Sequence, residues 1–454
     1  MVTSPMPERH PVETLPRGVR VGYSLGSLAT GAFGTVPGLL LLPYLTDTLG
    51  VAAGLAGFVI LLPKAWDVLV NPAAGRLSDR TQTRWGARRP YLLYGGLALA
   101  AAFAALFAGP VGTPAAGAAY VAVAFLVTAT AFAFFQVPFV AMPAEMTDGY
   151  AERTRLMTWR IALLAVAILV SGAAAPLVRD AAGGGRAGYR LMGLFVAALI
   201  VVGALGAFVG TRTAPLGAVQ ESEPSLRRQL AVVSRNRPFR QLLVCFVIQA
   251  AGIAAMLAGV QYFADHVLHR HGATTILFAC FVGPALLVMP VWLRVGDRLG
   301  KLRGFVIGSV LFAAGALGIA LAAGVGPAAV YLVTVLVGCG YAGQQVFAMS
   351  MLPDCIAADE LRTGRRQAGV FTGVWTAGET LGLAFGPALY GLVLQIFGYV
   401  SSEDGVIVTQ SHRAELGVLL GFTALPAAVM IGALIVMRRY TEPDGGVAAH
   451  GRTR

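Results

Sequence analysis

Long apolar segments recur along the whole chain and constrain its fold more than any other feature. One helical crossing of a bilayer needs about 20 apolar residues, and we expect twelve crossings. Their expected limits are 20–46, 51–76, 90–109, 115–143, 156–178, 189–211, 239–265, 273–296, 304–325, 327–353, 368–398 and 414–437. The chain is 57% hydrophobic and 12% charged, with a mean hydropathy of +0.72. A soluble protein of this length would need more polar surface, so we predict an all-α membrane protein.

Basic residues are concentrated in alternate connections between these segments. Residues 76–89 carry several arginines, whereas 109–114 and 324–327 contain no cation. Basic loops of membrane proteins remain in the cytoplasm, so both termini are expected on the cytoplasmic side of the plasma (cell) membrane. The net charge of +12 is spread over these loops and not gathered in one patch. We therefore expect contact with anionic membrane lipids and no nucleic-acid partner.

A polar interruption near the middle of the chain divides six segments from six. Glu145 follows the fourth segment and Asp354 follows the tenth, each one or two residues after a proline. Such repeats are typical of transporters whose solute site lies between two bundles. We predict an N-terminal six-helix bundle (1–212), a cytoplasmic linker (213–238) and a C-terminal six-helix bundle with a cytoplasmic tail (239–454). Because each pair of bundles encloses its own pathway, a monomer is expected.

Three polar residues share one face of the second segment. Lys64 and Asp67 are three residues apart, and Asp67 and Asn71 are four apart, so their side chains are stacked along a helix. An ionised carboxylate at bilayer depth costs about 2.5–3.5 kcal/mol on insertion scales and normally faces a partner or a wet cavity. The pattern favours the internal pathway of a solute transporter. A structural Lys64–Asp67 ion pair is the alternative.

Other polar residues interrupt later apolar segments. Arg160 and Glu379 are candidates for the same pathway, as are Gln136, Gln344 and Gln345. Each has a structural alternative. Arg160 could extend toward the headgroups, Gln136 could hydrogen-bond a neighbouring helix, Glu379 could pair with a base, and the two adjacent glutamines could serve packing.

Charged residues at the cytoplasmic ends of the segments are expected to form gating salt bridges and not to bind solute. The expected gate residues are Asp79, Arg80, Arg84, Glu145, Arg153, Asp297, Arg298, Asp354 and Arg365.

No metal site or cofactor is expected. The cysteines lack the spacing of metal ligands and are interpreted as packing thiols, and the histidines are interpreted as part of a solvated loop. These residues are Cys245, Cys280, Cys339, Cys355, His266, His269 and His271. No nucleotide-binding glycine loop follows a strand, and no nucleophile–histidine–carboxylate set is evident, so an enzyme is not expected. A channel is disfavoured because the repeated halves suit alternating access.

Several short motifs occur in a characteristic order and spacing. They are YLTD at 44–47, KAWD at 64–67 followed by Asn71-Pro72, GRLSDRTQTRWGARRP at 75–90, Val137-Pro138 with Pro143-Ala144-Glu145, ERTR at 152–155, and LPD at 352–354 in a region extending to Gly369. Over the whole chain, this set resembles the major facilitator superfamily. Within it, the set is similar to the melibiose permease-like glycoside-pentoside-hexuronide:cation symporters. The resemblance implies twelve helices in two six-helix bundles and solute uptake coupled to a cation.

The resemblance also suggests roles for individual positions. Asp67 matches a family carboxylate, whereas Asn71 stands where the family has a second one. Gln136 replaces a sugar- and cation-binding aspartate, Val140 a stacking tryptophan, and Gly31 an aspartate that anchors sugar hydroxyls.

Two further positions, in the fifth and eleventh segments, have counterparts in the family. Thr380, next to Glu379, replaces a family lysine, and Arg160 matches a family arginine. The solute is accordingly expected to contact a set drawn from both halves: Lys64, Gly31, Gln136, Val140, Arg160, Gln345, Trp375, Glu379 and Thr380.

The coupling cation is expected to involve Asp67, Asn71 and Gln136. Because Na⁺ prefers several oxygen ligands, some of them charged, one carboxylate with two amides favours H⁺, with Na⁺ as the alternative. A sugar or glycoside is the expected solute. The second interpretation is an amphiphilic or anionic solute, such as a lysolipid or organic acid, with altered or no cation coupling. Arg160 and Lys64 would then bind its carboxylate or phosphate.

Overall fold

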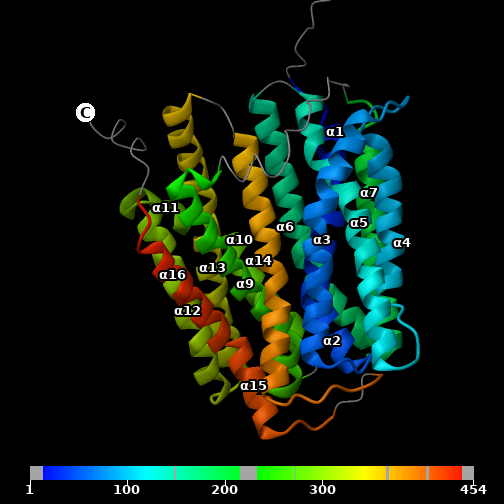
Figure 1. Cartoon of the computed structure of the whole chain (residues 1–454), viewed down its shortest axis with the longest axis vertical. Helices are drawn as coiled ribbons and strands as arrows, with labels where there is room; N and C mark the ends of the chain where they lie inside the picture. The colour runs from blue at the N-terminus through cyan, green and yellow to red at the C-terminus, as the bar shows by residue number, and fades with distance from the viewer. Residues whose placement is uncertain are drawn as a thin grey trace, which may run out of the picture.

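The chain folds into long helices that run mostly along the longest axis of the molecule (Figure 1). The computed structural model describes residues 14–147, 150–214, 233–270, 272–364, 368–404 and 408–441. Its helices are α1 (Arg17–Leu25), α2 (Ser27–Asp47), α3 (Ala53–Arg80), the π-helix η1 (Tyr91–Gly95), α4 (Gly96–Leu106), α5 (Pro114–Met146), α6 (Tyr150–Ala181), α7 (Gly185–Gly210), α9 (Arg237–His266), α10 (Ala273–Leu287), α11 (Met289–Leu299), α12 (Lys301–Ala323), α13 (Pro327–Thr363), α14 (Ala368–Ile396), α15 (His412–Phe422) and α16 (Ala424–Met437).

Each predicted crossing coincides with one helix or with consecutive helices. Among the described residues, nine helical segments are long and apolar enough to cross a membrane, or ten if the bent pair α10–α11 is one span. The second and third crossings contain only shorter apolar stretches, Ala53–Lys64 and Tyr91–Leu106. In α3 the apolar stretch ends at Lys64, shortly before Asp67. The all-α, multi-pass membrane fold is confirmed.

Three of the crossings are interrupted. The first breaks at Gly26, between α1 and α2, and the last at Thr423, between α15 and α16. The α10–α11 pair bends by 53° next to Pro290, which lies in the first turn of α11. Proline supplies no backbone N–H and its ring disfavours a continuous helix, which accounts for this break.

The helices pack first within each half of the chain. In residues 14–214, α2 contacts α6 and α7, and α3 contacts α5. In residues 233–441, α9 contacts α14 and α16, and α12 contacts α13. Figure 1 shows α4, α5 and α7 at one side of the molecule and α11, α12 and α16 at the other. The predicted bundle boundaries stay predictions, since most of the predicted linker (215–232) lies outside the described residues.

The two ends of the molecule differ in how the halves meet. We call the end that carries residues 81–90 the basic end, and the end that carries residues 397–411 the opposite end (top and bottom of Figure 1). Every hydrogen bond or ion pair between a described residue of the first half and a described residue of the second lies toward the opposite end. Helix pairs α3–α14, α2–α9 and α6–α10 form this junction.

Specific contacts hold the opposite end together. Thr46 Oγ1 lies 2.6 Å from Tyr262 OH, and the backbone N–H of Gly54 donates to Gln395 Oε1 at 2.8 Å. Close helix approach adds to these bonds, because a Cβ placed on Gly391 of α14 would lie 2.4 Å from the carbonyl oxygen of Ala53. In the described residues, the halves are therefore joined by hydrogen bonds at this end alone.

Candidate functional site

The polar face of α3 begins with Lys64 and Asp67. Asp67 is 5% exposed, and its Oδ1 atom has no hydrogen-bond partner among the described residues. Lys64 Nζ lies 5.3 Å from the ring centroid of Phe33 in α2, a cation–π arrangement. Lys64 is therefore directed toward α2 within the first half, whereas Asn71, one turn beyond Asp67, is exposed.

No ion pair within 4.0 Å joins Lys64 to Asp67, both of which the structure describes. The alternative of a structural ion pair between them is therefore not formed in this structure. A buried carboxylate oxygen without a donor carries a large desolvation penalty. The environment of Asp67 thus favours binding of a hydrogen-bond donor, a cation or a proton.

One face of α5 brings the predicted residues of the first half together. Phe132, Gln136 and Phe139 recur at helical spacing and therefore share this face. Phe132 stacks on Phe33 with a centroid separation of 4.2 Å, next to Lys64. At the other end of the face, the guanidinium carbon of Arg160 lies 5.2 Å from the Phe139 ring.

Gln136 and Arg160 on or beside this face retain unused polar atoms. Gln136 Oε1 and Arg160 Nε are buried and have no hydrogen-bond partner in the described part of the chain. Ser27 of α2 donates to the backbone carbonyl of Arg160 at 3.1 Å, which fixes α6 beside α2. The face thus presents an amide acceptor and a guanidinium donor within one layer of helices.

Two other predicted residues of the first half lie differently. Gly31 is buried, and an added Cβ would lie 2.7 Å from the side chain of Ala167 in α6, so this position serves close helix packing here. Val140 is 44% exposed and lies one residue beyond Phe139.

The predicted residues of the second half divide between an aromatic cluster and a polar group. Trp375 is 2% exposed and stacks on Phe246 of α9, with ring centroids 4.3 Å apart. Its Nε1 atom has no partner among the described residues. Glu379 and Thr380, one turn further along α14, are partly exposed. Trp375 therefore contributes mainly to packing in this structure.

Helix α13 adds further amides. Gln345 Nε2 donates to Tyr341 OH at 3.3 Å. Gln344 is 1% exposed, and neither of its side-chain polar atoms has a partner within the described ranges. The sequence identified both glutamines but left open whether they line a cavity.

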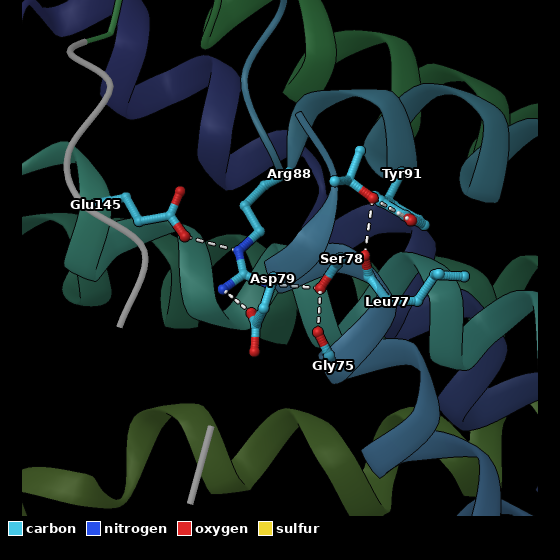
Figure 2. A network of polar contacts seen from close by, with 8 residues as sticks. Gly75, Leu77, Ser78, Asp79, Arg88, Tyr91 and Glu145 are labelled. Carbon is cyan, nitrogen blue, oxygen red and sulfur yellow. Dashed lines mark hydrogen bonds and ion pairs between the residues drawn. The ribbon is translucent and has the colours of Figure 1, made fainter. Parts of the chain in front are cut away.

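Arg88 organises the charges at the basic end of the first half. Figure 2 shows its guanidinium between Asp79 of α3 and Glu145 of α5. The distances are 2.5 Å to Asp79 Oδ1 and 2.7 Å to Glu145 Oε1, and Nη1 donates to Ser78 Oγ at 2.5 Å. Arg88 is 5% exposed. The sequence predicted the two carboxylates as gate residues but not the arginine that joins them.

The second half contains a similar contact. Lys301, the first residue of α12, pairs with Asp354 of α13 at 2.6 Å. Asp354 follows the tenth crossing as Glu145 follows the fourth, and this repeat is the sequence signal from which Lys301 could have been sought. Among the described residues, Glu145 and Asp354 each pair with a basic residue of their own half.

The remaining predicted gate residues form no such centre in the described structure. Arg153 donates to the carbonyl of Thr147 at 2.9 Å, and Arg84 lies over the ring of Trp85. The other described members are exposed, and Arg365 lies outside the described residues; the exposed residues are Arg80, Asp297 and Arg298.

The histidine prediction was wrong for one residue. His266 is 9% exposed, and its Nε2 lies 2.9 Å from Tyr399 OH, because the chain beyond α14 folds over the end of α9. His269 is exposed and His271 lies outside the described residues. Cys245 and Cys355 are buried, as expected of packing thiols.

Comparison with known proteins settles the family. Residues 22–442 match the family described as MFS/sugar transport protein. The chain belongs to this family. It is therefore a membrane transporter of the major facilitator superfamily that carries a small-molecule solute, and not an enzyme.

Individual proteins agree with this family assignment. A putative glycoside/cation symporter YagG of Escherichia coli is 26% identical, over 95% of this chain and 94% of its own. A glucuronide carrier protein homolog of Escherichia coli is also 26% identical, over 93% and 92%. The crystal structure of the nucleoside transporter NupG superposes with a TM-score of 0.65 at 13% identity, over 93% of this chain and 99% of that one. This last likeness shows the shared fold.

Proposed function

We propose that this MFS transporter takes up a sugar or glycoside together with a cation by alternating access, with Asp67 as the coupling residue. The observation that carries the proposal is the buried Asp67 carboxylate, which has an unused oxygen and no ion pair to Lys64 among the described residues. The symporter names of relatives that cover nearly the whole chain support this assignment.

The proposed orientation places the basic end and both termini in the cytoplasm of a cell whose plasma membrane holds the protein. Arginine-rich connections such as 81–90 support this placement through the positive-inside rule. The opposite end would then face outward. Because hydrogen bonds join the described halves only at that end, the conformation corresponds to one in which solute exchanges with the cytoplasm. We further propose that it functions as a monomer in contact with anionic lipids.

We propose H⁺ as the coupling ion. Asp67 is the only carboxylate of the predicted coupling set, and Gln136 contributes one amide oxygen, while Asn71 is exposed. Sodium prefers a larger set of oxygen ligands, whereas a proton needs one carboxylate oxygen. Na⁺ coupling is the alternative.

The cationic groups of the first half favour a solute that bears a carboxylate. Arg160 Nε has no hydrogen-bond partner in the described residues, and Arg–carboxylate contacts are strong and directional. A sugar acid would satisfy this donor and would still offer hydroxyls to Gln136. A relative named as a glucuronide carrier homolog is consistent with this choice. A lysolipid or other organic acid, with altered or no coupling, is the second candidate for the same reason.

The coupling proposal predicts the behaviour of Asp67→Asn. In proteoliposomes, uptake of radiolabelled glucuronate driven by an imposed pH gradient should fall to background, because the amide cannot carry the proton. Exchange without a gradient should persist if the solute site is intact. A Leu77→Ala variant, at an exposed position further along α3, is the control. Unchanged pH-driven uptake by Asp67→Asn would refute proton coupling at this residue.

Solute identity is tested separately by thermal stabilisation of the purified protein. A ligand that binds the folded state raises the midpoint in a concentration-dependent way. Glucuronate and glycosides should stabilise the protein, whereas a shift with lysolipids alone would favour the second candidate.

A further inference from the structure

A polar cavity at the opposite end lies between the two halves, away from Asp67. Its volume is about 330 Å³, and the residues that line it include Asp47 and Arg179 from the first half and Gln261, Asp265 and His266 from the second. It is present where α2, α6 and α9 end and the segment after α14 crosses over them. Neither the proposed coupling site nor the basic-end ion pairs contribute to it.

Hydrogen bonds between the halves build one wall of this cavity. Tyr399 OH donates to Asp47 Oδ1 at 2.9 Å and lies 2.9 Å from His266 Nε2. Thr46 Oγ1 also donates to Asp47 Oδ1, at 2.8 Å. The orientation of the Asp47 carboxylate is thus fixed from both sides of the junction.

One buried side chain that lines the cavity has an unused acceptor. Gln261 is 7% exposed, and its Oε1 atom has no hydrogen-bond partner in the described structure. Buried amide oxygens normally accept a hydrogen bond, so a ligand that donates one is expected to bind next to this atom. Arg179 is the only lysine or arginine among the described residues that line the cavity, and its guanidinium already contacts Asp180 Oδ1 at 2.5 Å and Tyr189 OH at 3.4 Å.

The groups that line the cavity determine the chemistry of a ligand. The described lining residues include three carboxylates, those of Asp47, Asp180 and Asp265, of which Asp180 is paired with the guanidinium of Arg179. Amide and carboxylate oxygens accept hydrogen bonds from hydroxyl groups. Within the described ranges no cluster of three or more His, Cys, Asp or Glu is arranged to hold a metal ion. The volume of the cavity and its several acceptor oxygens therefore suit a small organic molecule that carries several hydrogen-bond donors.

We propose that this cavity is a second binding site, for a small polyhydroxylated solute such as a monosaccharide. Because the ligand would contact both halves, it stabilises the conformation in which the opposite end is joined. The proposal rests on the proposed function only for calling this face external. Binding of solute from that side would slow the separation of the two halves at this end. The concentration of external solute would then change the rate of transport.

Direct binding to the full-length protein in lipid nanodiscs tests this site, with glucose, glucosamine and glucuronate as probes. For the binding component that depends on Gln261, the carboxylates of this cavity predict the tightest binding for protonated glucosamine and the weakest for glucuronate. Gln261→Met, which nearly conserves volume, should weaken glucose binding at this site about tenfold, as expected for one lost hydrogen bond. The matched control is Gln241→Met, because Gln241 lies in the same helix and also has a buried Oε1 without a partner among the described residues, but near the basic end.

Two further variants, one in this cavity and one at the proposed coupling site, distinguish the possible outcomes of the binding experiment. Asp47→Asn retains an oxygen acceptor for Tyr399 and should remove most of the preference for glucosamine over glucose. Asp67→Asn should leave this binding component intact, so that failure of the coupling proposal is distinguishable. The inference is overturned if no probe shows a binding component that Gln261→Met weakens and Gln241→Met does not. It is also overturned if, within that component, glucuronate binds most tightly.

Discussion

Arg88 shows how one side chain can determine the local arrangement of two helices. It contacts carboxylates from the end of α3 and the end of α5 and is almost fully buried. Removing one member of a buried ion pair leaves its partners uncompensated, which typically costs 3–5 kcal/mol. Arg88 therefore has a structural role in the first half, whatever else the carboxylates do during transport.

Replacement of Arg88 tests this structural role. Arg88→Gln should lower the free energy of unfolding by about 3–5 kcal/mol, measured by denaturant titration of the purified protein. Arg84→Gln is the control, because Arg84 is an exposed arginine in the same connection, and it should change stability by about 0.5 kcal/mol or less. Equal effects of the two variants would argue against the network in Figure 2.

The sequence predicted some members of the charged clusters but not their pairing. Asp79, Glu145 and Asp354 were recognised from their positions after crossings. Arg88 and Lys301 were not, because several basic residues stand in each connection and only tertiary packing selects one. His266 was misplaced for a related reason: its burial depends on Tyr399, which is distant in sequence.

At the scale of elements, nearly all helix positions could be predicted. Apolar length locates most of them, since a crossing must match the bilayer thickness, although the second and third crossings contain only shorter apolar stretches. The breaks within crossings were missed, because glycine and proline also occur inside the uninterrupted helices α3 and α5. The α3 site residues were found from helical spacing, whereas the shared face of α5 required the observed ring contacts.

The close approach of α3 and α14 gives a prediction at this scale. Gly391→Val would place a side chain against the carbonyl oxygen of Ala53 and should separate the helices at the opposite end. We expect a large loss of uptake in proteoliposomes while the protein still folds. The control is Gly369→Val on the same helix, where an added Cβ meets nothing within 4 Å. Normal uptake by Gly391→Val would contradict a need for this contact.

At the scale of the whole molecule, alternating access requires that the junction at the opposite end separates. Within the described ranges, hydrogen bonds join the two halves at that end alone, as expected for two bodies that move relative to each other. A carrier with a permanently fixed junction would expose its solute site to one side only.

A cross-link tests this requirement. Gly54 and Gln395 contact each other across the halves, so cysteines at both positions should form a disulfide under oxidation when the four native cysteines are replaced by alanine. We expect oxidation to stop uptake and a reductant to restore it. Each single-cysteine variant serves as the control. Full uptake by the oxidised double variant would show that the junction does not open during the cycle.

The bend between α10 and α11 has a mechanical consequence for such movement. Thr275 near the start of α10 donates to the Ala173 carbonyl of α6 across the junction, whereas Trp292 of α11 donates to the Cys339 carbonyl of α13. The 53° interruption beside Pro290 lies between these two anchors. A straight, continuous helix would transmit a rotation from one contact to the other. The interruption allows α10 to change its direction relative to α11. Helix α10 can therefore move with α6 of the first half while Trp292 keeps its hydrogen bond to α13.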